Sequence, residues 1–489
     1  MSLSSTAASA IVELEGIALS RAIHRREVSC LEVMQAFLAQ IERFNPGANA
    51  LVSLQPPELV LQQAREADAA LARGEGHGWM HGFPQAPKDL TPVAGMVTTR
   101  GSPIHRERVT TVDGLSVERM RRAGAIFVGR SNSPEFGLGS HTYNQVFGVT
   151  RNAFDPARSA GGSSGGAAVA VALRMLPVAD GSDMMGSLRN PAGYNNIFGF
   201  RPSFGRVPNW PADDVFFAQF STWGPMARSV ADIAMLLSVQ AGWDARVPLS
   251  SREPAGVFAS PLERGFKGAR VGWLGDLGGY LAMEPGVLPL CEAALGHFRE
   301  LGCTVEAAAP DFPPETLWRA WNTLRSASVA SNYAGHYENP AERALLKPEA
   351  IWEIEQGLKL SARDVQRASV ERSSWYQAVL RLFARFDYLV LPTAQTFPFA
   401  AGLDWPRSVG GREMDTYHRW MEVVVPATMA GLPALNVPAG FSADGLPMGL
   451  QIIGPAQADR AVLELGHAYD LASGLARRRS PLLDAARGS

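Results

Sequence analysis

Two segments rich in glycine and serine hold the hydroxyl groups best suited to chemistry. Residues 159–166 read Ser-Ala-Gly-Gly-Ser-Ser-Gly-Gly, and residues 181–192 read Gly-Ser-Asp-Met-Met-Gly-Ser-Leu-Arg-Asn-Pro-Ala. Glycine permits positive φ and close approach of other groups, and a serine hydroxyl can attack a carbonyl or relay a proton. A flexible linker is the competing interpretation of the first segment. For the second it is a turn held by an Asp–Arg ion pair, although such a turn can also present backbone N–H groups to an anion.

Lysine is rare in this chain, so each lysine is a candidate for a role that arginine cannot fill. Lys and Arg together number 45, and only four are lysines: Lys88, Lys267, Lys347 and Lys359. Lys88 stands in Ala-Pro-Lys-Asp-Leu, where burial would lower the pKa of its amine. A neutral lysine can be the general base that a serine nucleophile needs. The alternative is an ordinary surface lysine.

Helical patterns and short apolar runs alternate along the chain and must bring these segments together. A capping box at Ser29 and Glu32 precedes apolar residues at helical spacing, which predicts a helix that ends at Pro46-Gly47. Further helices are expected at 59–73, 115–122, 288–301 and 362–386, and strands at 125–129, 270–274 and 388–391. Strands interleaved with helices predict an α/β fold around one large, buried sheet.

The length of 489 residues allows either several ordinary domains or one large α/β unit. No internal repeat or flexible linker is apparent in the sequence. We therefore expect one core at 76–489, with a helical segment at 1–75 packed on it. The aromatic-rich stretch at about 290–385 is expected to form a helical lobe that faces the substrate.

Composition disfavours several classes of protein. Hydrophobic residues are 46% and charged residues 19%, which suits a large core. The sequence shows no apolar stretch typical of a membrane span and no secretory signal pattern, and a net charge of −2 disfavours nucleic-acid binding. The spacing of Cys30, Cys291 and Cys303 predicts neither a disulfide framework nor a zinc site. We expect no metal or other cofactor and a cytoplasmic location.

Taken together, these segments resemble the amidase signature enzymes, which hydrolyse amides with a Ser–Ser–Lys triad. The resemblance rests on Gly-Gly-Ser-Ser-Gly-Gly, on the later Gly-Ser-x-Arg-x-Pro-Ala and on the upstream Lys-Asp pair. It extends from about Leu31 to Tyr469 and also includes the segments 132–136, 199–202, 224–230 and 430–451. It implies a large central mixed β-sheet covered by helices, and an enzyme that hydrolyses linear amide C–N bonds.

The resemblance also implies a role for each residue of the site. Ser187 matches the nucleophile that carries the acyl group, Ser163 the bridging serine after a cis peptide bond, and Lys88 the general base. Ser163 would pass the proton of Ser187 to Lys88. Three side chains would support this network: Ser164, Asp183 and Arg189. Four backbone N–H groups would form the oxyanion hole: those of Met184, Met185, Gly186 and Ser187.

One position departs from the family pattern, which usually has two glycines before the nucleophile. This chain has Met185-Gly186, so the turn either has a negative φ at Met185 or takes a different shape. We interpret the change as altered substrate preference, because all three triad residues are present. Nearby apolar residues predict an apolar or aromatic group on the substrate: Phe136, Tyr143, Met185 and Trp223.

Other functions fit parts of the same pattern. Gly-Gly-Ser-Ser-Gly matches the G-x-S-x-G elbow of an α/β-hydrolase esterase, with Ser163 as nucleophile and an Asp or Glu and a His downstream. The glutamine-dependent amidotransferase A-type subunit, which works with partner subunits, shares the family motifs. A phosphate-binding loop is disfavoured, because Gly-Lys-Ser/Thr and G-x-G-x-x-G are absent.

We rank a stand-alone amidase first, with aryl amides, alkyl amides, carbamates and esters all open as substrates. The expected partners are a small-molecule amide and water, with no nucleic acid and no membrane. A homodimer is an open option.

Overall fold

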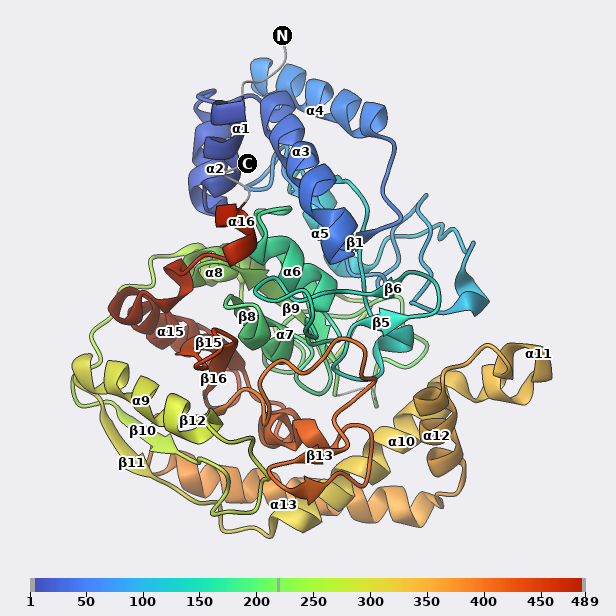
Figure 1. Ribbon diagram of the computed structural model, residues 1–489, viewed down its shortest axis with the longest axis vertical. Helices are drawn as coiled ribbons and strands as arrows, with labels where there is room; N and C mark the ends of the chain where they lie inside the picture. The colour runs from blue at the N-terminus through green and yellow to red at the C-terminus, as the bar shows by residue number, and fades with distance from the viewer. Residues whose placement is uncertain (1–4, 218–219, 486–489) are drawn as a thin grey trace.

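The computed structural model describes residues 5–217 and 220–485, and its centre is one eight-stranded β-sheet (Figure 1). The strand order is β11-β10-β12-β16-β15-β8-β9-β7. β10 runs parallel to β11 and β12, whereas the other neighbouring strands are antiparallel. The strand bounds are β7 (Ala179–Asp183), β8 (Phe198–Arg201), β9 (Thr222–Ala227), β10 (Arg270–Trp273), β11 (Thr304–Ala307), β12 (Tyr388–Pro392), β15 (Ala434–Phe441) and β16 (Pro447–Ile453). The predicted α/β fold with a large mixed sheet is confirmed.

Helices surround this sheet (Figure 1). The helices are α1 (Ser5–Glu13), α2 (Gly16–His24), α3 (Cys30–Ala48), α4 (Pro57–Ala72), α5 (Leu115–Arg122), α6 (Gly165–Ala172), α7 (Arg189–Tyr194), α8 (Val230–Gln240), α9 (Val287–Glu300), α10 (Pro314–Glu338), α11 (Pro340–Arg343), α12 (Pro348–Leu358), α13 (Ala362–Phe383), α14 (Val425–Met429), α15 (Asp459–Ser473) and α16 (Pro481–Ala485). Within the described ranges, no helix combines the length and the apolar character that crossing a membrane requires.

Outside the main sheet, the described residues form four pairs of two-residue strands. They are β1 (Leu51–Val52) with β4 (Arg130–Ser131), β2 (Pro84–Gln85) with β3 (Ile126–Phe127), β5 (Tyr143–Asn144) with β6 (Gly148–Val149), and β13 (Ser408–Val409) with β14 (Arg412–Glu413). The expected strand at 125–129 is therefore β3, but it pairs with β2 and does not enter the large sheet. The expected strands at 270–274 and 388–391 are β10 and β12 in that sheet.

The capping box at the start of α3 is confirmed. Ser29 Oγ accepts from the N–H of Glu32 at 3.1 Å, and Glu32 Oε2 accepts from the N–H of Ser29 at 2.9 Å. The helix continues through Pro46 to Ala48, so the predicted end at Pro46-Gly47 was too early. Asn49 ends it with a φ of 49°, and its N–H bonds to the carbonyl of Asn45. Asn tolerates this left-handed conformation better than most residues.

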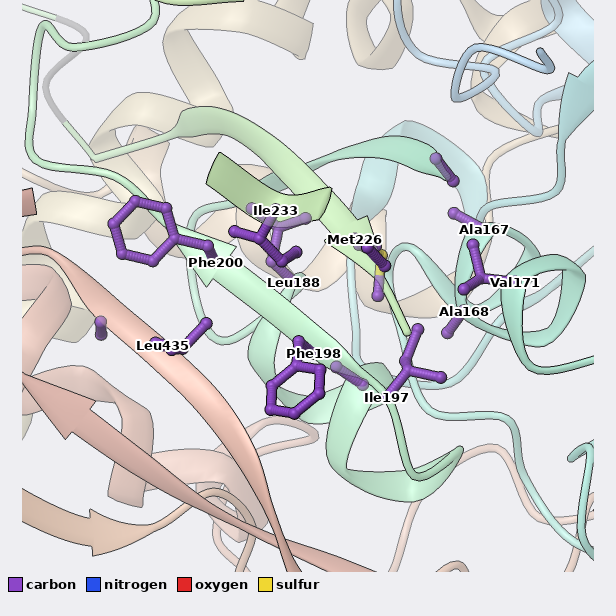
Figure 2. Close-up of a cluster of buried hydrophobic side chains, with 14 of the residues drawn as sticks. Ala167, Ala168, Val171, Leu188, Ile197, Phe198, Phe200, Met226, Ile233 and Leu435 are labelled. Atoms are coloured by element: carbon purple, nitrogen blue, oxygen red, sulfur yellow. The ribbon is translucent and has the colours of Figure 1, made fainter. Parts of the chain in front are cut away.

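The core beside the serine segments packs α6 and α8 against the sheet. Figure 2 shows Ala167, Ala168 and Val171 of α6 in this apolar cluster. It also shows residues from α8 and from three strands: Ile233, Phe198, Phe200, Met226 and Leu435. All eight residues of α6 are buried, and their small side chains let the helix lie close to the sheet. The loop before α6 is thereby held on a rigid base.

The helices α12 and α13 both pack on α10, and the three form a lobe at one side of the molecule (Figure 1). One part of the expected lobe belongs elsewhere, because β11 is an edge strand of the main sheet. The N-terminal segment likewise reaches the rest of the chain through the pairing of β1 with β4. The boundaries at residue 75 and near residues 290 and 385 stay predictions.

Candidate active site

The amine of Lys88 is surrounded by three serine hydroxyls. Its Nζ donates to Ser163 Oγ at 2.7 Å, to Ser164 Oγ at 2.8 Å and to Ser182 Oγ at 3.1 Å. The side chain is fully buried, as the sequence led us to expect. Three acceptors match the three donors of a protonated lysine. A neutral amine would donate two hydrogen bonds and accept the third.

Burial lowers the pKa of Lys88 to about 7, against the pull of the buried carboxylates of Asp180 and Asp183, which favour the charged form. Removing an amine from water penalises its cation because the low-dielectric interior solvates charge poorly. Near neutral pH, a substantial fraction of Lys88 is therefore uncharged. An uncharged amine carries the lone pair that a general base requires.

Ser163 and Ser164 lie in the loop that leads into α6. The peptide bond between Gly162 and Ser163 is cis, as the family resemblance implied. A Cβ added to Gly181 would lie 2.6 Å from Ser164 Oγ, so strand β7 passes the serine only because it has glycine there. The N–H of Ser164 donates to the carbonyl of Ser187 at 3.2 Å, which joins the two serine segments directly.

Ser187 lies in the tight turn between β7 and α7. Gly186 has a φ of 78°, and a Cβ there would lie 2.9 Å from the side chain of Val424, so this position requires glycine. Asp183 Oδ1 accepts from the N–H of Gly186 at 2.9 Å, and Oδ2 accepts from that of Leu188 at 3.2 Å. The carboxylate of Asp183 thus holds both sides of the turn.

Two arginines fix Asp183 in its charged form. Arg189 donates to its two carboxylate oxygens, from Nε at 3.0 Å and from Nη2 at 3.0 Å, and Arg201 bonds it as well. Burial alone would raise the pKa of Asp183, but Arg189 and Arg201 outweigh it and hold that pKa well below the usual range. Arg189 also reaches Val424, Thr428 and Gln451. The expected bracing by Asp183 and Arg189 is therefore present in the geometry.

Four N–H groups are expected to form an oxyanion hole, and this expectation stays a prediction. In this structure one of them, the N–H of Gly186, already has an acceptor in Asp183. Among the described residues, the N–H groups of Met184, Met185 and Ser187 have no acceptor. Met185 has a negative φ. The turn therefore accommodates methionine in place of the usual glycine through a negative φ at this position, as the first of our two alternatives stated. Three N–H groups remain available to a developing negative charge.

The hydroxyl of Ser187 is unpaired in the described part of the chain, and Ser163 Oγ bonds Lys88 there and no other residue. Ser187 itself is 6% exposed. Hydrogen bonds between catalytic groups are often long without substrate and tighten in the complex. The structure places Lys88, Ser163 and Ser187 in one site, and the expected link between the hydroxyls of Ser163 and Ser187 is not formed in it.

The residues expected to contact substrate occupy different places. Trp223 on β9 pairs with Ser182 on β7, so it stands beside the serine cluster. Met185 is 3% exposed and packs in the main core, whereas Met184 is half-buried. Arg325 of α10 donates to the sulfur of Met184 at 3.7 Å. Met184 is therefore the methionine of this turn that reaches the helical lobe.

Phe136 lies against the lobe, with its ring stacked on Tyr333 at 4.4 Å between centroids. Its neighbour Gly137 faces Ser163. Tyr143 lies in the wall of a separate cavity of about 510 Å³, which Lys347 and Tyr417 also line. Lys88, Ser163 and Ser187 do not line that cavity.

Sequence reasoning missed Ser182 and Asp180 beside the lysine. Both lie on β7 two residues apart, and alternate residues of a strand share one face. Burial raises the pKa of Asp180 to about 6, although the charges of Arg130 and Lys88 oppose this. The alternation of Asp180 and Ser182 was the available signal, but it had meaning only once that stretch was known to be a strand.

The α/β-hydrolase alternative requires a histidine that can serve Ser163. In the described ranges that hydroxyl contacts Lys88, and no histidine bonds Ser163 or Ser187. His141 is the histidine nearest in sequence, and it bonds Ser159 instead. Across the same ranges, no three His, Cys, Asp or Glu side chains are grouped so that they could hold a metal ion.

Comparisons with known proteins agree with this geometry. A model of the family described as Amidase matches residues 32–463. The A-type subunit of the glutamyl-tRNA(Gln) amidotransferase of Methylococcus capsulatus is 33% identical over 479 residues, which cover 93% of this chain and 96% of that protein. The acylamidase of Rhodococcus erythropolis is 34% identical over 460 residues, which cover 92% of this chain and 93% of that protein.

The crystal structure of a bacterial aryl acylamidase from the amidase signature family superposes with a TM-score of 0.89. It is 30% identical and covers 97% of this chain and 99% of its own. These matches span nearly the whole chain, and they exclude the alternative that the protein is an α/β-hydrolase. The chain therefore belongs to the amidase signature family and is an amide-hydrolysing enzyme.

Proposed function

We propose that this protein is a stand-alone amidase that forms an acyl-enzyme on Ser187, with Ser163 as proton relay and Lys88 as base. The observation that carries the proposal is the contact of a buried lysine amine with Ser163 Oγ at 2.7 Å. A buried amine whose pKa is lowered to about 7 suits a base that works near neutral pH. The backbone bond between Ser164 and Ser187 supports the placement of the nucleophile next to this pair.

In the proposed acylation step, Ser187 Oγ attacks the carbonyl carbon and its proton moves to Ser163 Oγ. Ser163 passes its own proton to the neutral amine of Lys88. The carbonyl oxygen becomes an oxyanion that accepts hydrogen bonds from backbone N–H groups in the Met184–Ser187 turn. The C–N bond then breaks, and the proton returns from Lys88 through Ser163 to the leaving nitrogen. The acyl group stays on Ser187 as an ester.

Deacylation uses the same groups with water as the nucleophile. Water gives a proton through Ser163 to Lys88 as its oxygen attacks the ester carbon, and the second tetrahedral oxyanion occupies the same hole. When the ester bond breaks, the proton returns to Ser187 Oγ and the carboxylic acid is released. The enzyme ends in its starting protonation state.

We infer that the substrate carries an apolar or aromatic group. Trp223 stands beside the serine cluster, and the half-buried Met184 lies next to the nucleophile. Flexible methionine side chains adapt to apolar groups of different shapes. The structural similarity to an aryl acylamidase supports aryl amides as the first class to test, with alkyl amides, carbamates and esters after them.

The test is a hydrolysis screen over those four classes with the purified protein and its Ser187→Ala variant. We expect turnover of at least one amide by the wild-type protein and none above background by the variant. A burst of the released amine should accompany the first turnover where deacylation is slow. Near-normal turnover by Ser187→Ala would refute the assignment of the nucleophile.

A second candidate is the A-type subunit of a glutamine-dependent amidotransferase. The relative from Methylococcus capsulatus favours it, because its identity of 33% equals that of the acylamidase within one percentage point. Glutaminase activity distinguishes the two functions. If the chain hydrolyses no other amide and releases ammonia from glutamine only after partner subunits of such an amidotransferase are added, the stand-alone proposal is wrong.

A further inference from the structure

Lys347, at the start of α12, forms two hydrogen bonds to the segment of residues 135–138. Its Nζ donates to the carbonyl of Leu138 at 2.6 Å, and its backbone N–H donates to Glu135 Oε2 at 2.8 Å. The residue is 5% exposed. A charged lysine is rarely buried without a specific partner, and the amine of Lys347 has two: this carbonyl and the carboxylate of Glu349, whose Oε2 lies 4.0 Å away. The helical lobe is thereby tied to residues 135–138.

This segment lies next to Ser163, the bridging serine of the proposed mechanism. A Cβ added to Gly137 would lie 3.5 Å from Ser163 Oγ and 2.8 Å from Leu90 Cδ1. Gly137 has no Cβ, so its main chain faces the hydroxyl of Ser163 from somewhat farther away and borders it on this side. A displacement of the segment toward Ser163 would push its hydroxyl, and a displacement away would leave it without support on that side.

The segment also has an unusual backbone that needs support. Phe136 and Gly137 both have positive φ, at 52° and 73°. The φ of Phe136 is unfavourable for a residue with a Cβ and persists only where the surroundings fix it. Its own N–H bonds to the carbonyl of Arg100, and the N–H groups of the next two residues bond back within the turn. Lys347 is the side chain that holds the carbonyl at the far end.

Other groups hold the amine of Lys347 in place. It lies 5.3 Å from the ring centre of Tyr143 and 4.0 Å from Glu349 Oε2. Tyr143 in turn donates to Glu349 Oε1 at 3.1 Å. These contacts fix the direction of the amine toward Leu138 and leave it lining the cavity of about 510 Å³.

We propose that Lys347 is a positioning residue for the reaction: it holds residues 135–138 against Ser163, so that the bridging hydroxyl stays in line between Lys88 and Ser187. The inference rests on the proposed function, because it requires Ser163 to be the relay. Within the described residues, Lys347 forms no hydrogen bond to Lys88, Ser163 or Ser187. It acts through the main chain of Gly137, and it makes the helical lobe a support of the catalytic centre.

The first test compares Lys347→Met with wild type on a small amide found in the screen. Methionine keeps an apolar stem of similar length but cannot donate to Leu138. We expect kcat to fall about 10- to 100-fold, the loss that a small misplacement of a reacting group can cause, with KM little changed. Lys347→Arg keeps a donor and should recover part of the loss. Lys359→Met, an exposed position at the other end of α12, is the matched control and should keep wild-type kcat.

The second test asks whether the effect passes through Ser163. In a Ser163→Ala background, measured with an activated ester that leaves a residual rate, Lys347→Met should have little further effect on kcat. Two residues that act through one group are not additive. A merely structural role would lower the melting temperature and multiply with the Ser163→Ala loss. If Lys347→Met does not fold, Lys347→Leu, a shorter apolar change that also lacks a donor, takes its place in both tests.

The outcomes separate the inference from the proposed function. Near-normal activity of Ser163→Ala would refute the relay and with it the proposed function. A low rate for Ser163→Ala together with a wild-type kcat for Lys347→Met and Lys347→Leu would leave the proposed function standing and overturn the inference. Multiplicative losses in the double variant would overturn it as well.

Discussion

At the scale of single residues, the site depends on one amine that is kept out of water. Arginine could not replace Lys88, because a guanidinium stays protonated at neutral pH. Serine hydroxyls suit this position because they accept from the charged amine and can also donate to the neutral one. The three hydroxyls around Nζ therefore satisfy both protonation states of the amine. In the proposed mechanism, the pKa of Lys88 then decides at which pH the enzyme works.

We expect kcat/KM to rise as the pH passes through about 7. The pKa of Lys88 is lowered by burial to about 7, and below it the amine is protonated and cannot accept a proton. The measurement is a pH profile of kcat/KM with an amide whose own groups do not titrate between pH 5 and 10. An optimum near pH ~5 would contradict a lysine base, since only a carboxylate or a comparably acidic group is deprotonated there.

Ser182→Ala should move the acid limb of that profile to lower pH. Ser182 Oγ is one of the three acceptors around Nζ, and hydrogen bonds to the charged form of a group stabilise that form. Without this acceptor the ammonium is less stable and the pKa of Lys88 falls further. Ser182→Thr keeps a hydroxyl and serves as the control. An unchanged or upward-shifted acid limb in Ser182→Ala would show that Ser182 does not solvate the amine.

Adjacent methionines of the nucleophile turn should have separable effects. Met185 is 3% exposed in the core, so Met185→Ala should lower the free energy of unfolding by about 2–5 kcal/mol. Met184 is half-buried beside Ser187, so Met184→Ala should change the ratio of kcat/KM between a bulky and a small anilide. Denaturant unfolding and kinetics on both variants check this. If the ratio of kcat/KM changed in Met185→Ala and not in Met184→Ala, the residue that shapes the pocket would be Met185, where the chain departs from its family.

At the scale of elements, the sequence predicted segments with strong local signals and missed features set by distant contacts. The capping box of Ser29 and Glu32 placed the start of α3 correctly, because a capping box is local. The pairing of β3 with β2 was not visible, because strand pairing depends on residues far apart in the chain. The bond from Gly186 to Asp183 was missed for a different reason. It is local, but it depends on the φ of the turn, which the sequence does not state.

The candidate site was predictable to a similar extent. The resemblance to the family pointed to Lys88, Ser163 and Ser187, and the structure places all three together. Tyr143 lies in the wall of another cavity, because an aromatic residue near a motif in sequence need not face it in space. Ser182 escaped notice because its role depends on sharing one face of β7 with Asp180.

Gly186→Ala should lower kcat for every substrate by a similar factor. The turn between β7 and α7 needs a φ of 78° at this position, and a Cβ would lie 2.9 Å from Val424. The backbone must shift, and the N–H donors of Met185 and Ser187 shift with it. Loss of one oxyanion donor slows catalysis about 10²- to 10³-fold. Gly256→Ala, where an added Cβ meets nothing within 4 Å, is the control. A change in substrate ranking at unchanged overall rate would contradict a shared oxyanion role.

At the scale of the whole molecule, the site lowers the stability of the fold that holds it. The large sheet and the buried helix α6 keep Lys88 away from water, where its cation is unfavourable. The arginine pair on Asp183 offsets part of the cost of burying charge in the nucleophile turn, but Lys88 has neutral hydroxyls as its direct partners. Active sites commonly retain such unfavourable groups because function requires them.

This conflict predicts how stability depends on pH. The pKa of Lys88 is about 7 in the folded chain against an ordinary value of 10.5, so between these values the unfolded state binds one more proton at this residue. Stability attributable to Lys88 therefore rises with pH across that window, by at most about 1.4 kcal/mol per pH unit. Lys88→Met cannot titrate, so the free energy of unfolding of wild type minus that of Lys88→Met should increase from pH 7 to pH 9. Urea unfolding of both proteins at pH 7, 8 and 9 measures it, with the exposed Lys359→Met as control. A constant difference would mean that Lys88 keeps its ordinary pKa in the fold, and it could then not be the neutral base that the mechanism needs.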